Sequence, residues 1–195
     1  MQALERKITE MKPGRPERKD SNYVRHGTQC LIANFNVATG EIVSPTIGDT
    51  RTEADFLKHI INTINVDSNG KWIIILDQLN IHKSESLVKF VAEACGITMD
   101  LGEKGKKGIL KNMETRMKFL SNQEHRISFF YTPKHASWLN QIEVWFSILS
   151  ARLLKRLSVK SKKELKNKVL DFISYFNKTA AKAFKWTYRG RPLAS

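Results

Sequence analysis

The spacing of apolar side chains changes along the chain and predicts strands in some segments and helices in others. Between residues 31 and 37 every second side chain is apolar, which is the period of a strand. Thr39 and Gly40 predict a turn, and residues 41–46 return as the second strand of an antiparallel hairpin. Residues 73–76 are wholly apolar and mostly β-branched, so they predict a buried strand that ends at Asp77. Residues 126–131 predict one more strand.

Helical spacing occurs between and after these strands. Residues 52–64 begin with acids that suit a helix N-terminus and continue with one apolar face. Residues 85–94, 110–120 and 161–177 also predict helices. In a further helix with Ser137 as candidate N-cap, one apolar stripe is formed by Ile142, Trp145, Phe146, Leu149 and Leu153. Because strands and helices alternate, we expect an α/β fold with at least one parallel pair of strands.

Two segments interrupt this pattern. Residues 1–27 are polar, with breakers at 13–16, and predict a loop or arm. Gly14-Arg15-Pro16 also matches the core of short segments that bind the minor groove of DNA, although an ordinary loop is the simpler interpretation. Residues 96–126 combine glycines with lysines and predict a flexible basic insertion, either a solvated linker or a DNA contact.

Charge narrows the class of partner. The chain of 195 residues is long enough for one domain with a sizeable core, and its formal net charge of +14 favours a polyanionic partner. Residues 150–195 alone hold 13 basic side chains against 2 acidic ones. Such clustering is typical of nucleic-acid binding, although lysines along one helix face can also be merely solvated.

The cysteines and the hydropathy pattern indicate the cellular compartment in which the protein is expected. Cys30 and Cys95 lie in apolar surroundings without metal-ligand spacing, which predicts core residues in a reducing compartment. The sequence contains no run of eighteen apolar residues and no signal-peptide pattern. We therefore expect a soluble, cytoplasmic protein without a membrane partner.

Two carboxylates stand where a metal site would be built. Asp77 follows a predicted buried strand, and ligands of α/β sheets bind at the carboxyl ends of strands. Glu143 lies beside the apolar stripe of its helix, at the border of the buried face. Hard divalent cations take oxygen ligands, and two such ions can clamp both oxygens of a phosphoryl transfer. The alternative for each acid is a surface or capping carboxylate.

The blocks around these acids resemble those of a known family. Residues 76–83 (Leu-Asp-Gln-Leu-Asn-Ile-His-Lys) and residues 131–146, from Tyr-Thr-Pro-Lys-His to Ile-Glu-Val-Trp-Phe, are similar to the second and third catalytic blocks of DDE transposases of bacterial insertion sequences in the mariner superfamily. Residues 11–16, 23–28 and 184–187 also look like that family, so the likeness covers essentially the whole chain. It implies DNA cleavage at the ends of a mobile element followed by strand transfer, with Mg²⁺ or Mn²⁺ in a two-metal site.

The resemblance also implies a ribonuclease H-like mixed sheet flanked by helices, with three carboxylates around two ions. By position Asp77 is the second acid and Glu143 the third, while Gln78 stands where many relatives have Asn. The first acid belongs to a strand just before the segment matched by residues 2–6, so strand and acid are expected upstream of Met1. We expect a C-terminal transposase fragment, without the first strand and the helix-turn-helix part, that binds metal poorly and is inactive alone.

This interpretation divides the chain into a polar arm (1–27), a truncated catalytic domain with its insertion (28–157), and a basic helix and tail packed on it (158–195). Candidate DNA contacts, on elements near the acids, are Asn80, His82, Lys134, His135, Asn140, Arg152, Lys155 and Arg156. The asparagines and histidines have an alternative as caps or loop hydrogen bonders.

The expected partner is double-stranded DNA, at the element ends and at the target, together with a second copy or an intact transposase. Two other interpretations stay open. An inactive DNA-binding remnant would regulate transposition by competing for DNA or for subunits. An RNA-binding basic domain would prefer single strands to duplex.

Overall fold

The computed structural model describes residues 1–9, 12–15, 18–133 and 139–185, apart from the side chains of residue 8 and residues 18–20. Its strands are β1 (Gln2–Thr9), β2 (Arg18–Thr28), β3 (Cys30–Phe35), β4 (Ile42–Gly48), β5 (Trp72–Leu76) and β6 (Ile127–Tyr131). Its helices are α1 (Glu53–Ile64), α2 (Glu85–Ala94), α3 (Met113–Leu120), α4 (Ile142–Arg152) and α5 (Lys162–Thr179), with short 3₁₀ helices η1 (Asn80–Lys83) and η3 (Leu154–Arg156). The α/β class is confirmed. None of the described helices is long and apolar enough to cross a membrane.

Strands in the described part of the chain pair two by two. β1 and β2 are antiparallel, and so are β3 and β4. β5 and β6 form the parallel pair that the alternation of strands and helices predicted. The three pairs stay separate from one another, so the described residues do not form a single mixed sheet. Within β4 the ladder has a bulge at Ser44, whose φ is 50°, and Pro45 follows it.

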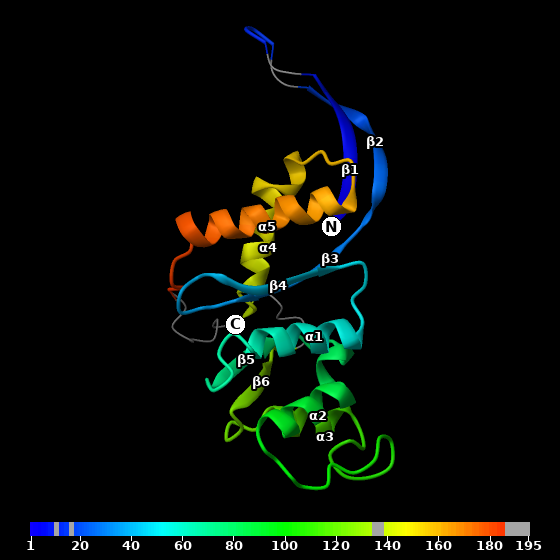
Figure 1. Ribbon diagram of the computed structural model, residues 1–195, viewed down its shortest axis with the longest axis vertical. Helices are drawn as coiled ribbons and strands as arrows, with labels where there is room; N and C mark the ends of the chain where they lie inside the picture. Colours follow the sequence, from blue (N-terminus) through cyan, green and yellow to red (C-terminus); the bar gives the residue numbers. More distant parts are fainter. Residues whose placement is uncertain (10–11, 16–17, 134–138, 186–195) are drawn as a thin grey trace, which may run out of the picture.

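The β1–β2 hairpin extends from one end of the molecule as an arm (Figure 1). The prediction of a loop over residues 1–27 was therefore wrong, although the segment is an arm. Most side chains of this hairpin are polar and at least partly exposed, so no alternation of apolar residues marks the strands. At its base, Ala3 is fully buried and the Met1 ammonium donates to the carbonyl oxygen of Gln29 (2.7 Å).

The predicted hairpin formed by β3 and β4 is present, and so are the predicted helices α1, α2 and α5. Thr52 caps α1 in a reciprocal pair of bonds with Asp55, and Ser161 caps α5. The helix that carries Glu143 begins at residue 142, later than predicted, and Gln141 before it makes no side-chain cap. Ser137, the predicted cap, lies outside the described residues.

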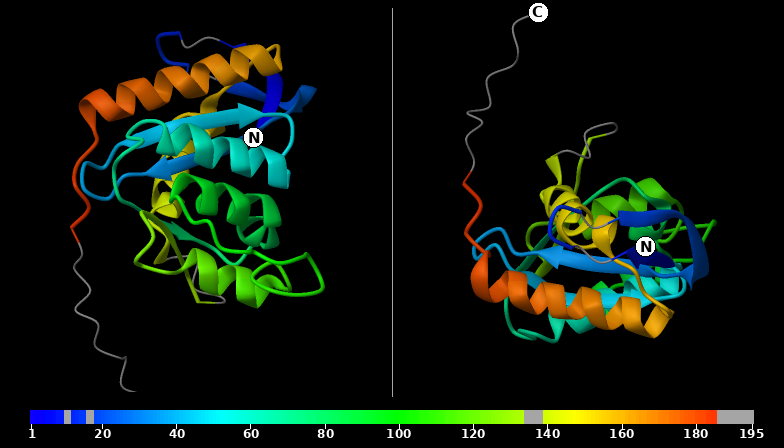
Figure 2. Two further views of the ribbon diagram at one scale, coloured as in Figure 1. Left: turned by 60° about the horizontal axis from the view of Figure 1, so that its bottom comes forward. Right: turned by 90° about the horizontal axis from the view of Figure 1, so that it is seen from above.

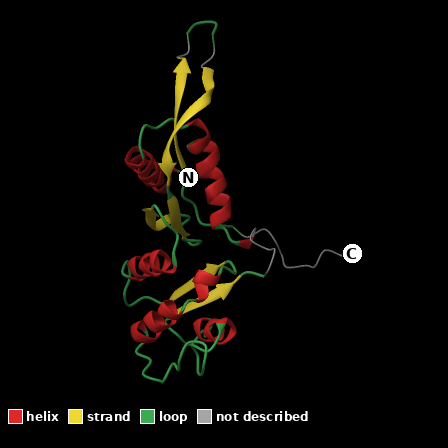
Figure 3. Ribbon diagram, turned by 90° about the vertical axis from the view of Figure 1, so that its right-hand side faces the viewer, coloured by secondary structure: helices red, strands yellow, loops and turns green. Residues whose placement is uncertain are grey.

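Helices lie on both sides of the β3–β4 hairpin, as the left view of Figure 2 and Figure 3 show, and the buried side chains form two hydrophobic cores. We call the first the α1–α3 core; its fully buried members include Ile60, Leu87, Val88, Val91, Leu120, Ile127 and Phe129. The second, the α4–α5 core, includes Ala3, Ile42, Trp145, Leu149, Val159, Leu165 and Val169. β3 contributes to both, because Ile32 packs against the first core and Leu31, Ala33 and Phe35 against the second.

The segment 96–126, expected to be a basic insertion with a short helix, contains α3 and packs in part against the α1–α3 core. Leu110 is 2 % exposed, and Leu101 and Ile109 pack beside it. Gly102 and Gly108 let two backbone segments cross closely: a Cβ on Gly102 would lie 2.2 Å from the carbonyl oxygen of Lys107.

Candidate active site

Asp77 lies directly after the carboxyl end of β5. The last residue of that strand, Leu76, pairs with Tyr131 of β6, and the backbone N–H of Thr132 donates to the Leu76 carbonyl oxygen (2.8 Å). Because the two strands are parallel, their carboxyl ends meet at one edge, where ligands of α/β sheets bind. The side chain of Asp77 is 42 % exposed at this edge.

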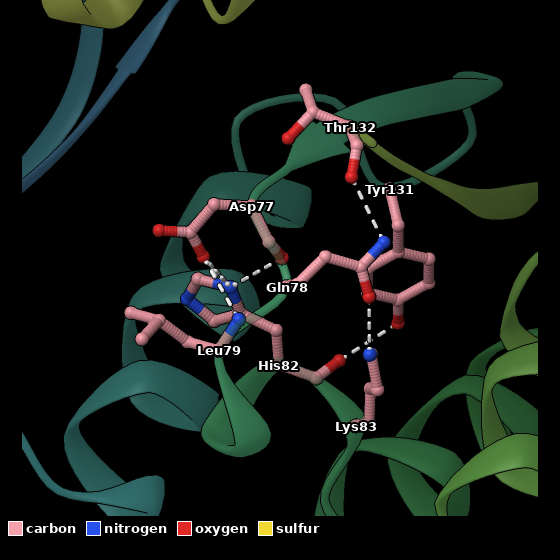
Figure 4. Close-up of polar contacts among 7 residues, drawn as sticks. All are labelled: Asp77, Gln78, Leu79, His82, Lys83, Tyr131 and Thr132. Atoms are coloured by element: carbon pink, nitrogen blue, oxygen red, sulfur yellow. Dashed lines mark hydrogen bonds and ion pairs between the residues drawn. The ribbon is translucent and has the colours of Figure 1, made fainter. Parts of the chain in front are cut away.

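Two donors hold one oxygen of the Asp77 carboxylate (Figure 4). Oδ1 lies 3.1 Å from the backbone nitrogen of Leu79 and 2.9 Å from Nδ1 of His82. The other oxygen, Oδ2, points away from these contacts and has no hydrogen-bond partner among the described residues. The carboxylate is thus fixed through one oxygen and open at the other.

His82 is buried beneath Asp77, where its ring lies 4.4 Å from the ring of Phe56, measured between centroids. Burial lowers the pKa of His82, while the main-chain oxygen and the carboxylate of Asp77 act in the opposite direction. A histidine with a lowered pKa is mainly neutral at pH 7, so its contact with Asp77 is a hydrogen bond more than an ion pair.

A second set of contacts ties the turn after β5 to the end of β6. Gln78 Nε2 donates to the Thr132 carbonyl oxygen (2.9 Å), and Lys83 Nζ donates to Gln78 Oε1 (2.5 Å). The Tyr131 hydroxyl donates to the carbonyl oxygen of His82 (2.8 Å), and burial raises the pKa of Tyr131, so this hydroxyl keeps its proton. These bonds fix the segment that carries Asp77 (Figure 4).

Glu143 lies in the first turn of α4 with its side chain exposed. Its backbone N–H donates to the carbonyl oxygen of Asn140 (3.0 Å), and the positive end of the helix dipole favours a carboxylate here. In Figure 1, β6 runs toward the end of α4 at which that helix begins, and β5 is parallel to β6.

The predicted DNA-contacting residues fall into separate places. Asn80 is exposed in η1 near Asp77, Asn140 is partly buried just before α4, and His82 is covered as described above. Arg152, Lys155 and Arg156 are exposed at the other end of α4 and in η3, and Arg152 lies about 14 Å along the helix from Glu143. Lys134 and His135 lie outside the described residues.

A divalent cation finds only part of a site here. Asp77 offers an open carboxylate oxygen, which is the ligand type that Mg²⁺ and Mn²⁺ take. Within the described ranges, however, no three His, Cys, Asp or Glu side chains are grouped so that they could hold a metal ion.

The network of His82, Gln78, Lys83 and Tyr131 was not predicted as such. Its members belong to the two sequence blocks that frame the acids, and this was the available signal. Sequence alone does not say whether a polar side chain near an acid faces that acid or the solvent.

Comparison with known proteins identifies the family to which the chain belongs. A family model described as DDE superfamily endonuclease matches residues 2–166. No curated protein and no solved structure matches the chain. Endonucleases of this superfamily act on DNA and generally use divalent metals. With most of its length matched, the chain belongs to the DDE superfamily endonucleases.

Proposed function

We propose that this chain is the C-terminal catalytic part of a DDE transposase of a bacterial insertion sequence, mariner-like, which cuts DNA at the ends of the element and transfers the cut strand. The observation that carries the proposal is the open Oδ2 of Asp77 at the carboxyl edge of two parallel strands, in a chain matched by a DDE endonuclease model. Asp77 and Glu143 are the two ligands that this chain contributes.

The chemistry assigned to each residue follows from its place. A bound Mg²⁺ or Mn²⁺ pair would activate water or a 3′-hydroxyl and stabilise the charge that develops on phosphate. Asp77 presents Oδ2 to such an ion, and Glu143 presents an exposed carboxylate from the start of a helix. Asn80 and Asn140 are near enough in the chain to these acids to bind the flanking phosphates.

A third acid would come from a strand outside this sequence. In support, the β3–β4 and β5–β6 pairs are separate, so both β3 and β5 have an unpaired edge among the described residues. The outer face of the β5–β6 pair is apolar and uncovered: Ile73 is 62 % exposed, Ile75 45 % and Phe130 37 %. A further apolar strand between the two pairs would complete a ribonuclease H-like sheet and bring its acid to Asp77.

DNA is held, in this proposal, by basic side chains beyond the acids. α5 carries exposed Lys163, Lys166, Lys168 and Lys178, and the end of α4 and η3 carry Arg152, Lys155 and Arg156. These charges act on the phosphate backbone and carry no base specificity. Lysines of α5 bound to DNA would give an affinity that falls steeply with salt.

Plasmid nicking tests the proposal. The chain, alone and extended by the residues encoded upstream of its first codon, is incubated with supercoiled DNA and Mn²⁺. We expect nicking by the extended protein, lost by at least a hundredfold in Asp77→Ala and in Glu143→Ala and kept in Asp171→Ala, which removes an exposed acid of α5. Equal nicking by Asp77→Ala and the unaltered protein would overturn the assignment.

A second candidate function is that of an inactive DNA-binding regulator. The observation in its favour is that the described residues do not group three metal-ligating side chains. This function predicts salt-dependent duplex binding with no nicking in either form, and inhibition of an intact transposase by the added chain. Stronger binding to single-stranded RNA than to duplex DNA would contradict both candidates.

A further inference from the structure

The turn after β5 folds back on its own first residue. η1 brings the ring of His82 beneath Asp77, so that Nδ1 lies 2.9 Å from Oδ1 and 3.3 Å from the main-chain oxygen of Asp77. A neutral imidazole carries a single N–H. Since Nδ1 faces two acceptors and no donor in these contacts, the proton belongs on Nδ1.

Neither the ring nor the backbone of His82 is free to move away. The ring packs against Phe56, and its backbone is bonded at both polar atoms: N–H to the Leu79 carbonyl oxygen (3.1 Å) and C=O to the Tyr131 hydroxyl (2.8 Å). A donor held in this way offers its N–H to Asp77 in one direction only.

Both donors near the carboxylate select the same oxygen. Leu79 N–H and His82 Nδ1–H meet Oδ1, and together they set the rotation of the carboxylate about its last bond. Oδ2 is consequently the oxygen turned outward, as Figure 4 shows. An exposed aspartate without these donors would lose rotational freedom when it binds an ion.

We propose that His82 is a positioning residue, which holds Oδ1 of Asp77 so that Oδ2 faces a divalent cation at the carboxyl edge of β5 and β6. The proposal rests on the function proposed above, in which Asp77 is a metal ligand. It replaces the earlier expectation that His82 binds phosphate. Hydrogen-bond partners of metal ligands typically change metal affinity by about 10- to 100-fold, which sets the expected effect.

Mn²⁺ binding by the full chain provides the first test. Paramagnetic broadening of backbone NMR signals is followed during a titration, with His82→Ala, His82→Asn and the control His125→Ala. The ring of His125 also packs on a phenylalanine (Phe119, 4.7 Å), but its hydrogen-bond partner is Asn122 and not an acid. We expect broadening centred on residues 77–79, a Kd raised about tenfold or more in His82→Ala, and partial recovery in His82→Asn, which keeps a side-chain N–H. The Kd of His125→Ala should not change.

The ring tautomer provides a readout that needs no metal. Nitrogen-15 NMR of the metal-free chain should show His82 protonated at Nδ1, and a ring protonated at Nε2 alone would overturn the positioning role. Equal Mn²⁺ affinity in His82→Ala and the unaltered chain, with both folded by circular dichroism, would also overturn it. An absence of broadening near residue 77 in every variant, also when the upstream residues of the nicking test are included, would instead contradict the metal role of Asp77 and hence the proposed function.

Discussion

The two cores contribute to the candidate site in different ways. Asp77 follows a strand of the α1–α3 core and is held by its neighbours through Oδ1. Glu143 stands on the helix of the α4–α5 core with an exposed side chain. One acid is therefore oriented by local contacts, whereas the position of the other depends on how α4 packs. This difference makes the connection between the cores, the β3–β4 hairpin, as important to the site as either acid.

The largest expected effect comes from opening each core in turn. Phe129→Ala and Trp145→Ala remove side chains that are at most 1 % exposed, so each should lower the free energy of unfolding by about 3–5 kcal/mol. Denaturant unfolding measures the loss, and hydrogen exchange reports which core opens. If the cores are coupled through β3, each variant lowers protection in both.

Protection lost only in the mutated core would show that the two halves unfold independently. Val66→Ala serves as the control, since Val66 is 63 % exposed and the change should cost less than about 0.5 kcal/mol.

The stability of the protein should depend on pH through His59 of α1. Burial lowers the pKa of His59 to about 4, and its Nδ1 lies 2.9 Å from the Thr46 hydroxyl of β4. Below pH 6.5 the unfolded chain gains a proton on His59 that the folded chain takes up only near pH 4. The free energy of unfolding should therefore decrease as the pH is lowered from 6.5 to 4, by up to about 3 kcal/mol. His59→Gln should flatten the curve of unfolding free energy against pH. An unchanged slope would mean that His59 does not cause it.

Helix caps allow a matched comparison of the two halves. Thr52→Ala removes the side-chain oxygen that accepts from Asp55 at the start of α1, and Ser161→Ala removes the one that accepts from Glu164 at the start of α5. Each should cost about 1 kcal/mol in thermal or denaturant unfolding. A much larger cost at one cap would indicate that its helix supports more of the fold than the other.

The smallest effect is expected from the ion pair between Lys162 and Asp49, which links α5 to the end of β4 (2.6 Å). Both side chains are well exposed, so Lys162→Ala should change the free energy of unfolding by less than about 1 kcal/mol, and by still less in high salt. A loss of several kcal/mol would mean that this contact couples the two halves.

Local patterns accounted for most of the elements. α1 and α2 were predicted because apolar periodicity and a capping residue agreed, and β5 because a short β-branched run ended on a polar residue. β1 and β2 were missed because their side chains are mainly polar. The separation into three strand pairs was not predictable, since pairing between distant strands leaves no trace in local spacing.

Sequence motifs predicted the position of Asp77 in the candidate site but not the contacts around it. Asp77 was expected at a strand end and lies there, while Asp77 and Glu143 as metal ligands stay predictions. His82 could not be assigned from sequence, because an exposed phosphate contact and a buried partner of Asp77 use the same residue at the same spacing.

The bulge in β4 has a consequence for how this protein associates with other chains. Pro45 lacks an N–H and Ser44 has a left-handed backbone conformation, so the free edge of β4 is a poor template for another strand. A further strand would therefore pair with the free edge of β3 more readily than with that of β4. Edge-to-edge association of two copies through β4 is likewise disfavoured.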